Sequence, residues 1–328
     1  MTLHDPTTFI VMRRLIFLLA LSLIFAACGD SDGETTSTQS AETSTSSTDT
    51  STTMAETTTT VPETTTTEAT TTTTELAGNW ADEPLVVSRS GALGWWDGGN
   101  WVQVDELTSL PVSGGEDYQV VLFGSDEIVS GGTPTILCEP VFNPGVELGD
   151  ADALGDWPDP VGLAISAPWD ITPHFIQEET DNGTYSDLAR PLLATRGLDV
   201  ENPVIKQVVR FDMDGNGENE VLAVAEDIED SDSLFAQEGD YSLVFMRIVV
   251  EGEVQTAILG ESIVTEVQEG TTPFILSHSV AAVADLSGDG KMEMIIHEVY
   301  YEGSGWSMWE YVNDDLGPVF QIGSGCGV

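Results

Sequence analysis

Basic residues are scarce in this chain. Nine lysines and arginines stand against 56 aspartates and glutamates, which gives a formal charge of −47 at pH 7. Proteins that bind nucleic acid need a basic face for the phosphates, so this composition argues against a nucleic-acid partner. It also disfavours direct adsorption to anionic lipid headgroups, and it makes the acidic groups of a compact state repel one another. High salt or divalent cations would relieve that repulsion.

Long apolar runs are also lacking. The main one covers residues 15–26, and it is shorter than the ~20 apolar residues that a membrane-spanning helix needs. It follows the positive segment Met12-Arg13-Arg14 and ends in small residues before Cys28. This order predicts a secretory signal peptide over residues 1–27, with translation starting at Met12.

The signal ends in Ala26-Ala27-Cys28, preceded by Phe25. This end resembles the lipobox of bacterial lipoproteins, in which small residues precede a cysteine and leucine usually stands at the position of Phe25. The resemblance implies a lipid on Cys28, which would hold the protein to a membrane because each buried methylene contributes ~0.8 kcal/mol. It places the protein outside the cytoplasm, on the cell membrane or cell surface. Cleavage as an ordinary secretory signal, which leaves a free thiol at Cys28, is the alternative.

Aromatic and aliphatic residues almost disappear after Cys28. Residues 33–75 are nearly all Thr, Ser, Glu and Ala, and such a segment cannot bury enough apolar surface to offset the entropy of ordering it. We therefore expect residues 28–78 to be a lipidated cysteine followed by a disordered tether. Stalks of this composition are often O-glycosylated, a point that the sequence leaves open. The folded domain is expected over residues 79–328.

Cysteine is rare in the expected domain as well. Cys138 and Cys326 are the only cysteines besides Cys28. Two cysteines in an oxidising compartment are a candidate disulfide, and this one would tie the C-terminal tail to an early strand. Two unpaired thiols are the alternative.

The expected domain alternates short β-branched runs with turn residues. Examples are residues 85–87, 118–123, 204–211, 221–225, 241–250 and 292–301. This spacing predicts a mainly β fold, either propeller-like or another short-strand architecture. One helical insertion is expected near residues 184–196, with Thr184 as its N-cap, Gly197 at its C-terminus and Pro191 kinking or splitting it. The alternative is an α+β domain that carries two acidic loops.

These two acidic segments match each other at a distance of 73 residues. The first runs from Asp212 to Glu220 and the second from Asp285 to Glu293. Both follow the pattern D-x-[D/S]-G-[N/D]-G-x-x-E and then enter a strand-like run. Ca²⁺ takes six to eight oxygen ligands at about 2.3–2.6 Å, so a tight loop must turn several oxygens inward. Glycines in each loop permit that turn.

Residues at alternate positions supply the oxygens for a predicted structural Ca²⁺ in each loop. The first loop offers Asp212, Asp214, Asn216, the main-chain carbonyl of Glu218, and Glu220. The second loop offers Asp285, Ser287, Asp289, the main-chain carbonyl of Lys291, and Glu293. Ser287 makes the second site the weaker one, because a hydroxyl replaces a carboxylate. Asp/Gly-rich turns without metal are the alternative for both.

The residues after each loop argue against an EF-hand. Its twelfth loop position needs a carboxylate and a helix follows, whereas Ala223 and Ile296 stand there in strand-like runs. The pattern instead resembles the calcium loops of FG-GAP and VCBS-type repeats, which occur in extracellular β-propellers and integrin-like proteins. In those families the loop lies between strands, and the acidic residue before the next strand is a ligand. The resemblance implies a calcium-stabilised binding or scaffold module of the cell envelope, with an envelope protein or a glycan as its partner.

Recognisable catalytic motifs are lacking. His174, His278 and His297 stand in no metalloprotease pattern, and neither a nucleophile elbow nor a P-loop is present. We therefore favour a protein without catalytic activity. An envelope hydrolase acting on glycans is the alternative, because its paired carboxylates meet in space rather than in sequence. Five tryptophans are expected to pack in the core more than to stack on sugars: Trp95, Trp96, Trp101, Trp306 and Trp309.

Overall fold

A computed structural model describes most of the chain beyond residue 74. The described ranges are 75–105, 109–122, 127–138, 143–150, 152–155, 161–171, 175–181, 183–250, 252–312 and 315–324. The chain divides into two units, Met1–Thr66 and Thr67–Val328, and every described residue belongs to the second. The predicted signal peptide, the lipid on Cys28 and the tether up to residue 74 lie outside the described residues, as does Cys326. The disulfide to Cys138 therefore stays a prediction.

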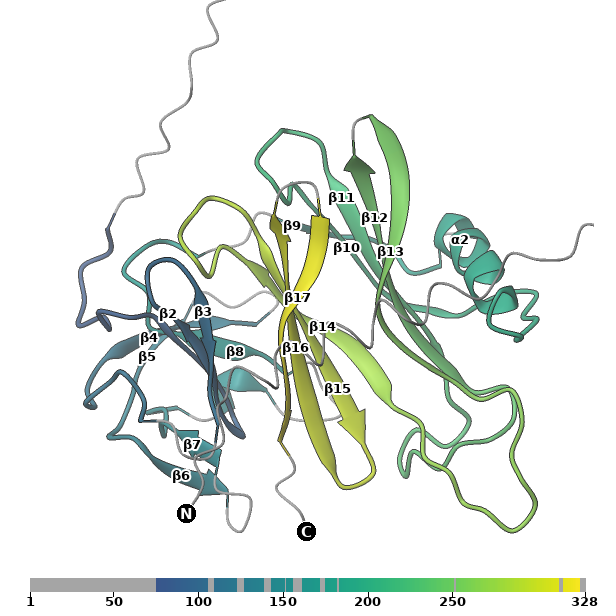
Figure 1. The fold of residues 1–328 in the computed structure, drawn as a ribbon, viewed down its shortest axis with the longest axis horizontal. Coiled ribbons are helices and arrows are strands. Elements are labelled where there is room, and N and C mark those ends of the chain that lie inside the picture. Colours follow the sequence, from purple (N-terminus) through teal and green to yellow (C-terminus); the bar gives the residue numbers. More distant parts are fainter. Residues whose placement is uncertain are drawn as a thin grey trace, which may run out of the picture. The chain divides into compact units, whose positions relative to one another are not determined.

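The fold of the described residues is mainly β, as the sequence predicted, and all strand pairs within its sheets are antiparallel (Figure 1). The first sheet has the order β3 (Trp101–Gln103), β2 (Gly91–Trp96), β1 (Leu85–Ser88), β8 (Leu163–Ile165), β4 (Asp117–Val121) and β5 (Ile128–Ser130). A separate hairpin consists of β6 (Thr135–Cys138) and β7 (Asn143–Gly145). A short 3-10 helix, η1 (Asp152–Leu154), lies between β7 and β8 in the chain.

The second and third sheets come from the C-terminal half. The second has the order β13 (Glu253–Ile263), β12 (Tyr241–Val250), β11 (Glu220–Asp227), β10 (Ile205–Phe211) and β9 (Phe175–Gln177). The third has the order β14 (Ser277–Ala284), β15 (Glu293–Tyr300), β16 (Gly303–Val312) and β17 (Asp315–Ser324). Strands β10–β13 and β14–β17 are therefore two consecutive meanders of four strands each.

The three larger sheets stack face to face. One cluster of buried side chains joins the first sheet to the third and includes Val86, Leu163, Ile295, Trp306 and Met308. A second cluster joins the second sheet to the other face of the third and includes Val209, Phe211, Val244, Val283 and Ile296. Successive side chains of a strand point to opposite faces, so neighbours in β15 enter different clusters. This burial on both faces explains the continuous apolar run of β15.

The stacking of meander sheets is propeller-like, but the described residues do not complete a propeller. They form three larger sheets, whereas propellers have four to eight blades of four strands. The tryptophans follow the prediction in part. Trp306 is buried, and Trp95, Trp101 and Trp309 pack against core clusters while staying partly accessible.

The single α-helix of the described residues, α2 (Gly183–Ala194), covers the outer face of the second sheet through Tyr185, Ala189 and Leu193. It begins before Thr184, so the prediction of Thr184 as the N-cap was wrong; the preceding residue lies outside the described ranges. The helix also continues through Pro191, so of the two expected outcomes, a kink or a split, the split was wrong. Buried residues on both sides of this proline hold the helix against the sheet, which offsets the lost main-chain hydrogen bond.

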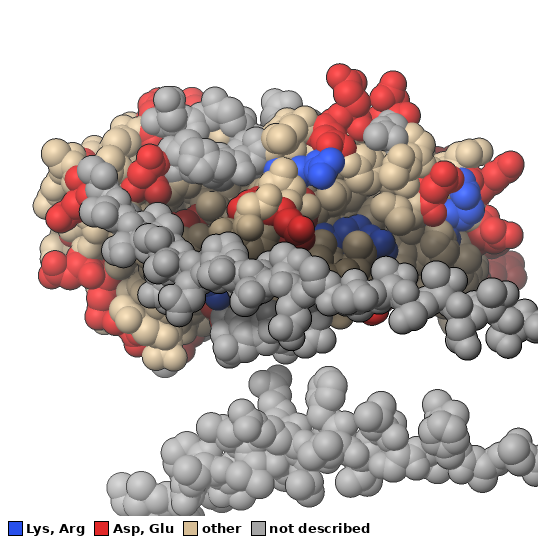
Figure 2. Space-filling view, turned by 90° about the horizontal axis from the view of Figure 1, so that it is seen from above, with Lys and Arg blue, Asp and Glu red and all other residues tan. Residues whose placement is uncertain are grey.

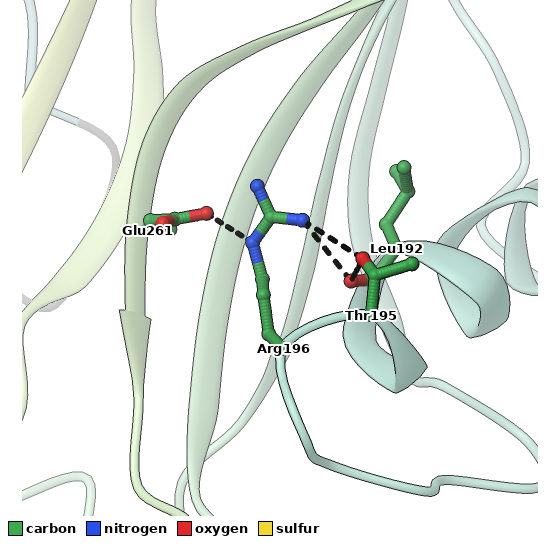
Figure 3. Close-up of polar contacts among 4 residues, drawn as sticks. All are labelled: Leu192, Thr195, Arg196 and Glu261. Carbon is green, nitrogen blue, oxygen red and sulfur yellow. Dashed lines mark hydrogen bonds and ion pairs between the residues drawn. The ribbon is translucent and has the colours of Figure 1, made fainter. Parts of the chain in front are cut away.

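Gly197 closes the C-terminus of α2 as predicted, and its φ of 87° is left-handed. The amide of Leu198 donates to Leu193 O and that of Gly197 to Ala194 O, both at 3.1 Å, which is a Schellman motif. Arg196 then ties the helix to the second sheet (Figure 3). Its Nη1 donates to Leu192 O at 3.1 Å while its Nε pairs with Glu261 on β13.

Candidate metal centre

Each acidic loop joins the first two strands of a meander. The first lies between β10 and β11 and the second between β14 and β15, so the predicted position between strands is confirmed. Phe211 and Glu220 bound the first loop, and Ala284 and Glu293 bound the second at the same spacing of 73 residues. Both loops therefore occupy the same place in two copies of one supersecondary unit.

The hydrogen bonds of the first loop turn its carboxylates inward. Asp212 Oδ2 accepts from Gly217 N at 2.8 Å, and its Oδ1 accepts from Asn216 N at 3.0 Å. Asn216 Oδ1 accepts from Glu218 N at 2.6 Å, and Glu220 Oε2 accepts from Met213 N at 3.1 Å. The loop thus folds around its own acidic side chains.

The second loop repeats these contacts. Asp285 Oδ2 accepts from Gly290 N at 3.0 Å, and Asp289 Oδ1 accepts from Lys291 N at 2.9 Å. Glu293 Oε2 accepts from Leu286 N at 2.7 Å. Each bond has its counterpart 73 residues earlier, and the two glycines of each loop are left-handed with φ between 76° and 88°. A side chain with a Cβ would be strained at those positions.

Three carboxylates converge in the first loop. Oxygens of Asp212, Asp214 and Glu220 lie within 4.8 Å of one another. Oxygens bound to one Ca²⁺ at ~2.4 Å lie no more than ~5 Å apart, so this spacing fits a single ion. The donors are hard oxygens, which suit Ca²⁺ rather than a metal that prefers nitrogen or sulfur. These three side chains would hold the ion, which would supply the positive charge that offsets their repulsion.

Glu220 is the closing residue of this cluster and is 2% exposed. Burial raises the pKa of its carboxyl, the main-chain amide of Met213 opposes that rise, and the charges of Asp214 and Asp212 add to it. A buried carboxylate beside two others is costly without a cation. The geometry and the electrostatics therefore favour a cation at the same point.

The other predicted ligands are less well placed. Asn216 and Glu218 are exposed, and the role predicted for the Glu218 carbonyl stays a prediction.

In the second loop Ser287 stands where the first loop has the carboxylate of Asp214. Among the described residues, the cluster of converging carboxylates belongs to the first loop. Burial raises the pKa of Glu293 to about 8 and also raises that of Asp285. That the second site binds calcium more weakly than the first stays a prediction.

Neighbours that sequence reasoning missed support both loops. Trp169 Nε1 donates to Asp285 O at 2.9 Å, although the two residues are 116 positions apart. Met213 and Leu286 occupy equivalent positions in the two loops, and both are buried in the clusters that join the sheets. An apolar residue after the first aspartate of each loop was a signal for this anchoring.

A cavity of about 350 Å³ lies elsewhere, beside the β1–β2 turn and the β6–β7 hairpin. Its lining is Ser88, Arg89, Leu137, Val146, Glu147, Leu148 and Leu154. It offers one carboxylate, whereas glycoside hydrolysis uses a pair. This cavity therefore does not support the hydrolase alternative.

No family model, curated protein or solved structure matches the chain. The resemblance to FG-GAP and VCBS-type loops thus rests on the loops themselves. None of the helices in the described ranges is long and apolar enough to cross a membrane. On the face seen in Figure 2, acidic side chains lie at many places among the described residues and basic ones at few.

Proposed function

We propose that the protein is a calcium-stabilised binding or scaffold module of the cell envelope, anchored by lipid on Cys28 and displayed outside the cytoplasm by its tether. Calcium acts here as a structural ion, because the loops connect strands rather than line a cleft. The observation that carries the proposal is the convergence of Asp212, Asp214 and Glu220 within 4.8 Å at the start of a meander.

The ion would stabilise more than its own loop. The first loop is bonded to the second through Met292 N and Met213 O at 2.9 Å, and the loops belong to different sheets. Met213 is also buried between those sheets. Calcium at the first loop would therefore stabilise the contact between the two meanders. This suits a module that must stay folded outside the cell.

Thermal melts in calcium and in chelator, at one high ionic strength, test the proposal. A ligand that binds only the folded state stabilises by RT ln(1 + [L]/Kd), which is ~2.7 kcal/mol at a hundredfold excess over Kd. We expect calcium to raise the midpoint, Asp212→Ala to abolish most of that rise, and Asp285→Ala to reduce it less.

Asp97→Ala is the matched control. Asp97 closes an Asp/Gly turn between β2 and β3 by accepting from Gly99 N and Asn100 N at 3.0 and 2.7 Å. Its loss should lower the midpoint equally in calcium and in chelator. If calcium shifts no midpoint, or if Asp212→Ala behaves like Asp97→Ala, both loops are plain turns and the proposal fails.

A further inference from the structure

Three aromatic rings from three separate loops meet at one end of the second and third sheets. Phe235 lies between β11 and β12, Phe274 between β13 and β14, and Tyr301 in the β15–β16 turn. The ring centroids of Phe274 and Tyr301 are 4.7 Å apart, and those of Phe235 are 5.3 and 5.4 Å from them. The ring planes are within 29° of one another. The rings thus form one compact aromatic stack.

The aromatic stack is held on a rigid base. Phe235 and Phe274 form an isolated antiparallel bridge, with Ala236 N donating to Pro273 O at 2.9 Å and Ile275 N donating to Leu234 O at 3.0 Å. Leu234, Ala236 and Ile275 are buried beneath it as a separate apolar cluster. The rings are therefore positioned before any partner arrives, which lowers the entropy lost on binding.

Two of the three rings face solvent. Phe274 is 49% exposed and Tyr301 is 51% exposed. Aromatic side chains bury much of their area in most proteins, and adjacent exposed rings of this kind typically mark an interaction surface. The rings stack on one another, and about half of the surface of Phe274 and of Tyr301 is left open to a partner.

The charged residues of the three loops that carry the rings are all acidic. The three ring-bearing loops carry these exposed acidic residues: Glu229, Asp232, Glu238, Glu266, Glu269 and Glu302. They carry no lysine or arginine, and Arg196, which follows α2, is paired with Glu261 on β13. An aromatic face attracts a cation through its quadrupole, and surrounding carboxylates strengthen that attraction.

We propose that this aromatic stack is the binding face of the module and takes an arginine-bearing segment of a protein partner. A guanidinium fits because it is planar, stacks on aromatic rings and pairs with carboxylates at the same time. The inference rests on the proposed binding function and names its partner class. The aromatic stack lies at the ends of β11, β13 and β15 that are away from the acidic loops, so each proposal can fail alone.

The test titrates the calcium-loaded protein with the peptide Gly-Arg-Gly-Arg-Gly and with its lysine twin, at fixed ionic strength, by calorimetry. We expect the arginine peptide to bind more tightly. Phe274→Ala and Tyr301→Ala should each weaken it about fivefold, which corresponds to ~1 kcal/mol of cation–π energy. Phe274→Leu, which keeps the apolar packing and removes the ring, should behave like Phe274→Ala.

Val254→Ala is the matched control, because Val254 is 56% exposed on β13 but lies at the hairpin end of that strand. It should leave binding unchanged. Equal binding of the two peptides, or an equal effect of Val254→Ala and Tyr301→Ala, would overturn the inference. Ring-dependent binding of a neutral chito-oligosaccharide in place of the peptide would also overturn it. A calcium-dependent melt together with any of these results would leave the calcium proposal standing.

Discussion

The main-chain amide of Met292 donates a 2.9 Å hydrogen bond to the main-chain oxygen of Met213. Met213 belongs to the first acidic loop and Met292 to the second, so this bond connects two sheets at their equivalent turns. A Cβ built on Gly215 would lie 3.8 Å from Gly290 O, which shows how closely the loops approach. We therefore expect a substitution or a bound ion at one loop to change the stability of the other loop.

Replacing Ser287 with aspartate should make the second loop equivalent to the first. Ser287→Asp adds the carboxylate that Asp214 supplies 73 residues earlier. In chelator the variant should be less stable than the parent, because the new charge lies beside Asp285 and Glu293. In calcium it should be more stable, and calorimetry should show additional bound calcium.

Ser287→Asn is the control for that variant, since it adds an oxygen without a charge. It should show a smaller loss in chelator and a smaller gain in calcium. A Ser287→Asp midpoint that falls by the same amount in calcium and in chelator would contradict a latent site in the second loop.

Glu293 should make the calcium-free protein less stable as the pH rises. Burial raises the pKa of this carboxyl from 4.5 to about 8. A group with a raised folded pKa contributes stability that is complete below its unfolded pKa and is lost as the pH passes its folded pKa. The free energy of unfolding in chelator should therefore decline between about pH 4.5 and 8, by at most ~1.4 kcal/mol per pH unit for one proton.

Urea unfolding across this pH range, with Glu293→Gln beside the parent, isolates the effect. General charge repulsion acts on both proteins, so the difference between them reports on Glu293. The curve of Glu293→Gln should be flatter. Parallel curves would show that this carboxyl titrates normally in the folded protein.

His297 should give the opposite trend in acid. It is buried, and its ring centroid lies 4.3 Å from that of Trp306. Burial lowers the pKa of His297 to about 4. A base with a depressed folded pKa contributes stability that is complete above its unfolded pKa of ~6.5 and is lost as the pH falls toward its folded pKa. His297→Phe should keep the ring contact and reduce the acid loss between about pH 6.5 and 4.

Urea unfolding at several acidic pH values measures this difference. His278 is also buried with its pKa lowered to about 4, so the variant should retain part of the acid sensitivity. A pH dependence identical to that of the parent would mean that His297 is solvated when folded.

Gly260 should not tolerate a methyl group. A Cβ there would lie 2.8 Å from Cδ2 and 3.0 Å from Nε2 of the buried His278 ring. His278 cannot move freely, because its main-chain N and its Nδ1 both lie 3.0 Å from Ser242 Oγ. Gly260→Ala should destabilise the protein by ~1–3 kcal/mol, as overpacking of a close-packed interior does.

Gly317→Ala is the matched control for Gly260→Ala. Gly317 lies in β17, which is also the fourth strand of a meander, and a Cβ there meets nothing within 4 Å. The midpoint of urea unfolding of Gly317→Ala should stay close to that of the parent. Equal losses for the two variants would show that strand glycines matter for their backbone rather than for His278.

Much of the candidate site could be predicted because its contacts are local in the chain. The hydrogen bonds within the acidic loops join residues at most seven positions apart, such as Met213 with Glu220. Ligand type and turn chemistry are then readable from a short segment. The hairpin turn at Gly252, with its φ of 80°, follows from the same local logic.

What the sequence determined by itself was the mainly β class, the helix near residue 184 and the two matching loops, since each depends on short-range periodicity and turn residues. Only the tertiary structure decided that the third sheet is buried on both faces and that Trp169 supports Asp285. It also brought Phe235, Phe274 and Tyr301 into one aromatic stack. These contacts join residues far apart in the chain, and they form when sheets stack to bury apolar surface, which is a non-directional force. A non-directional force leaves no fixed spacing in the sequence by which such partners could be recognised.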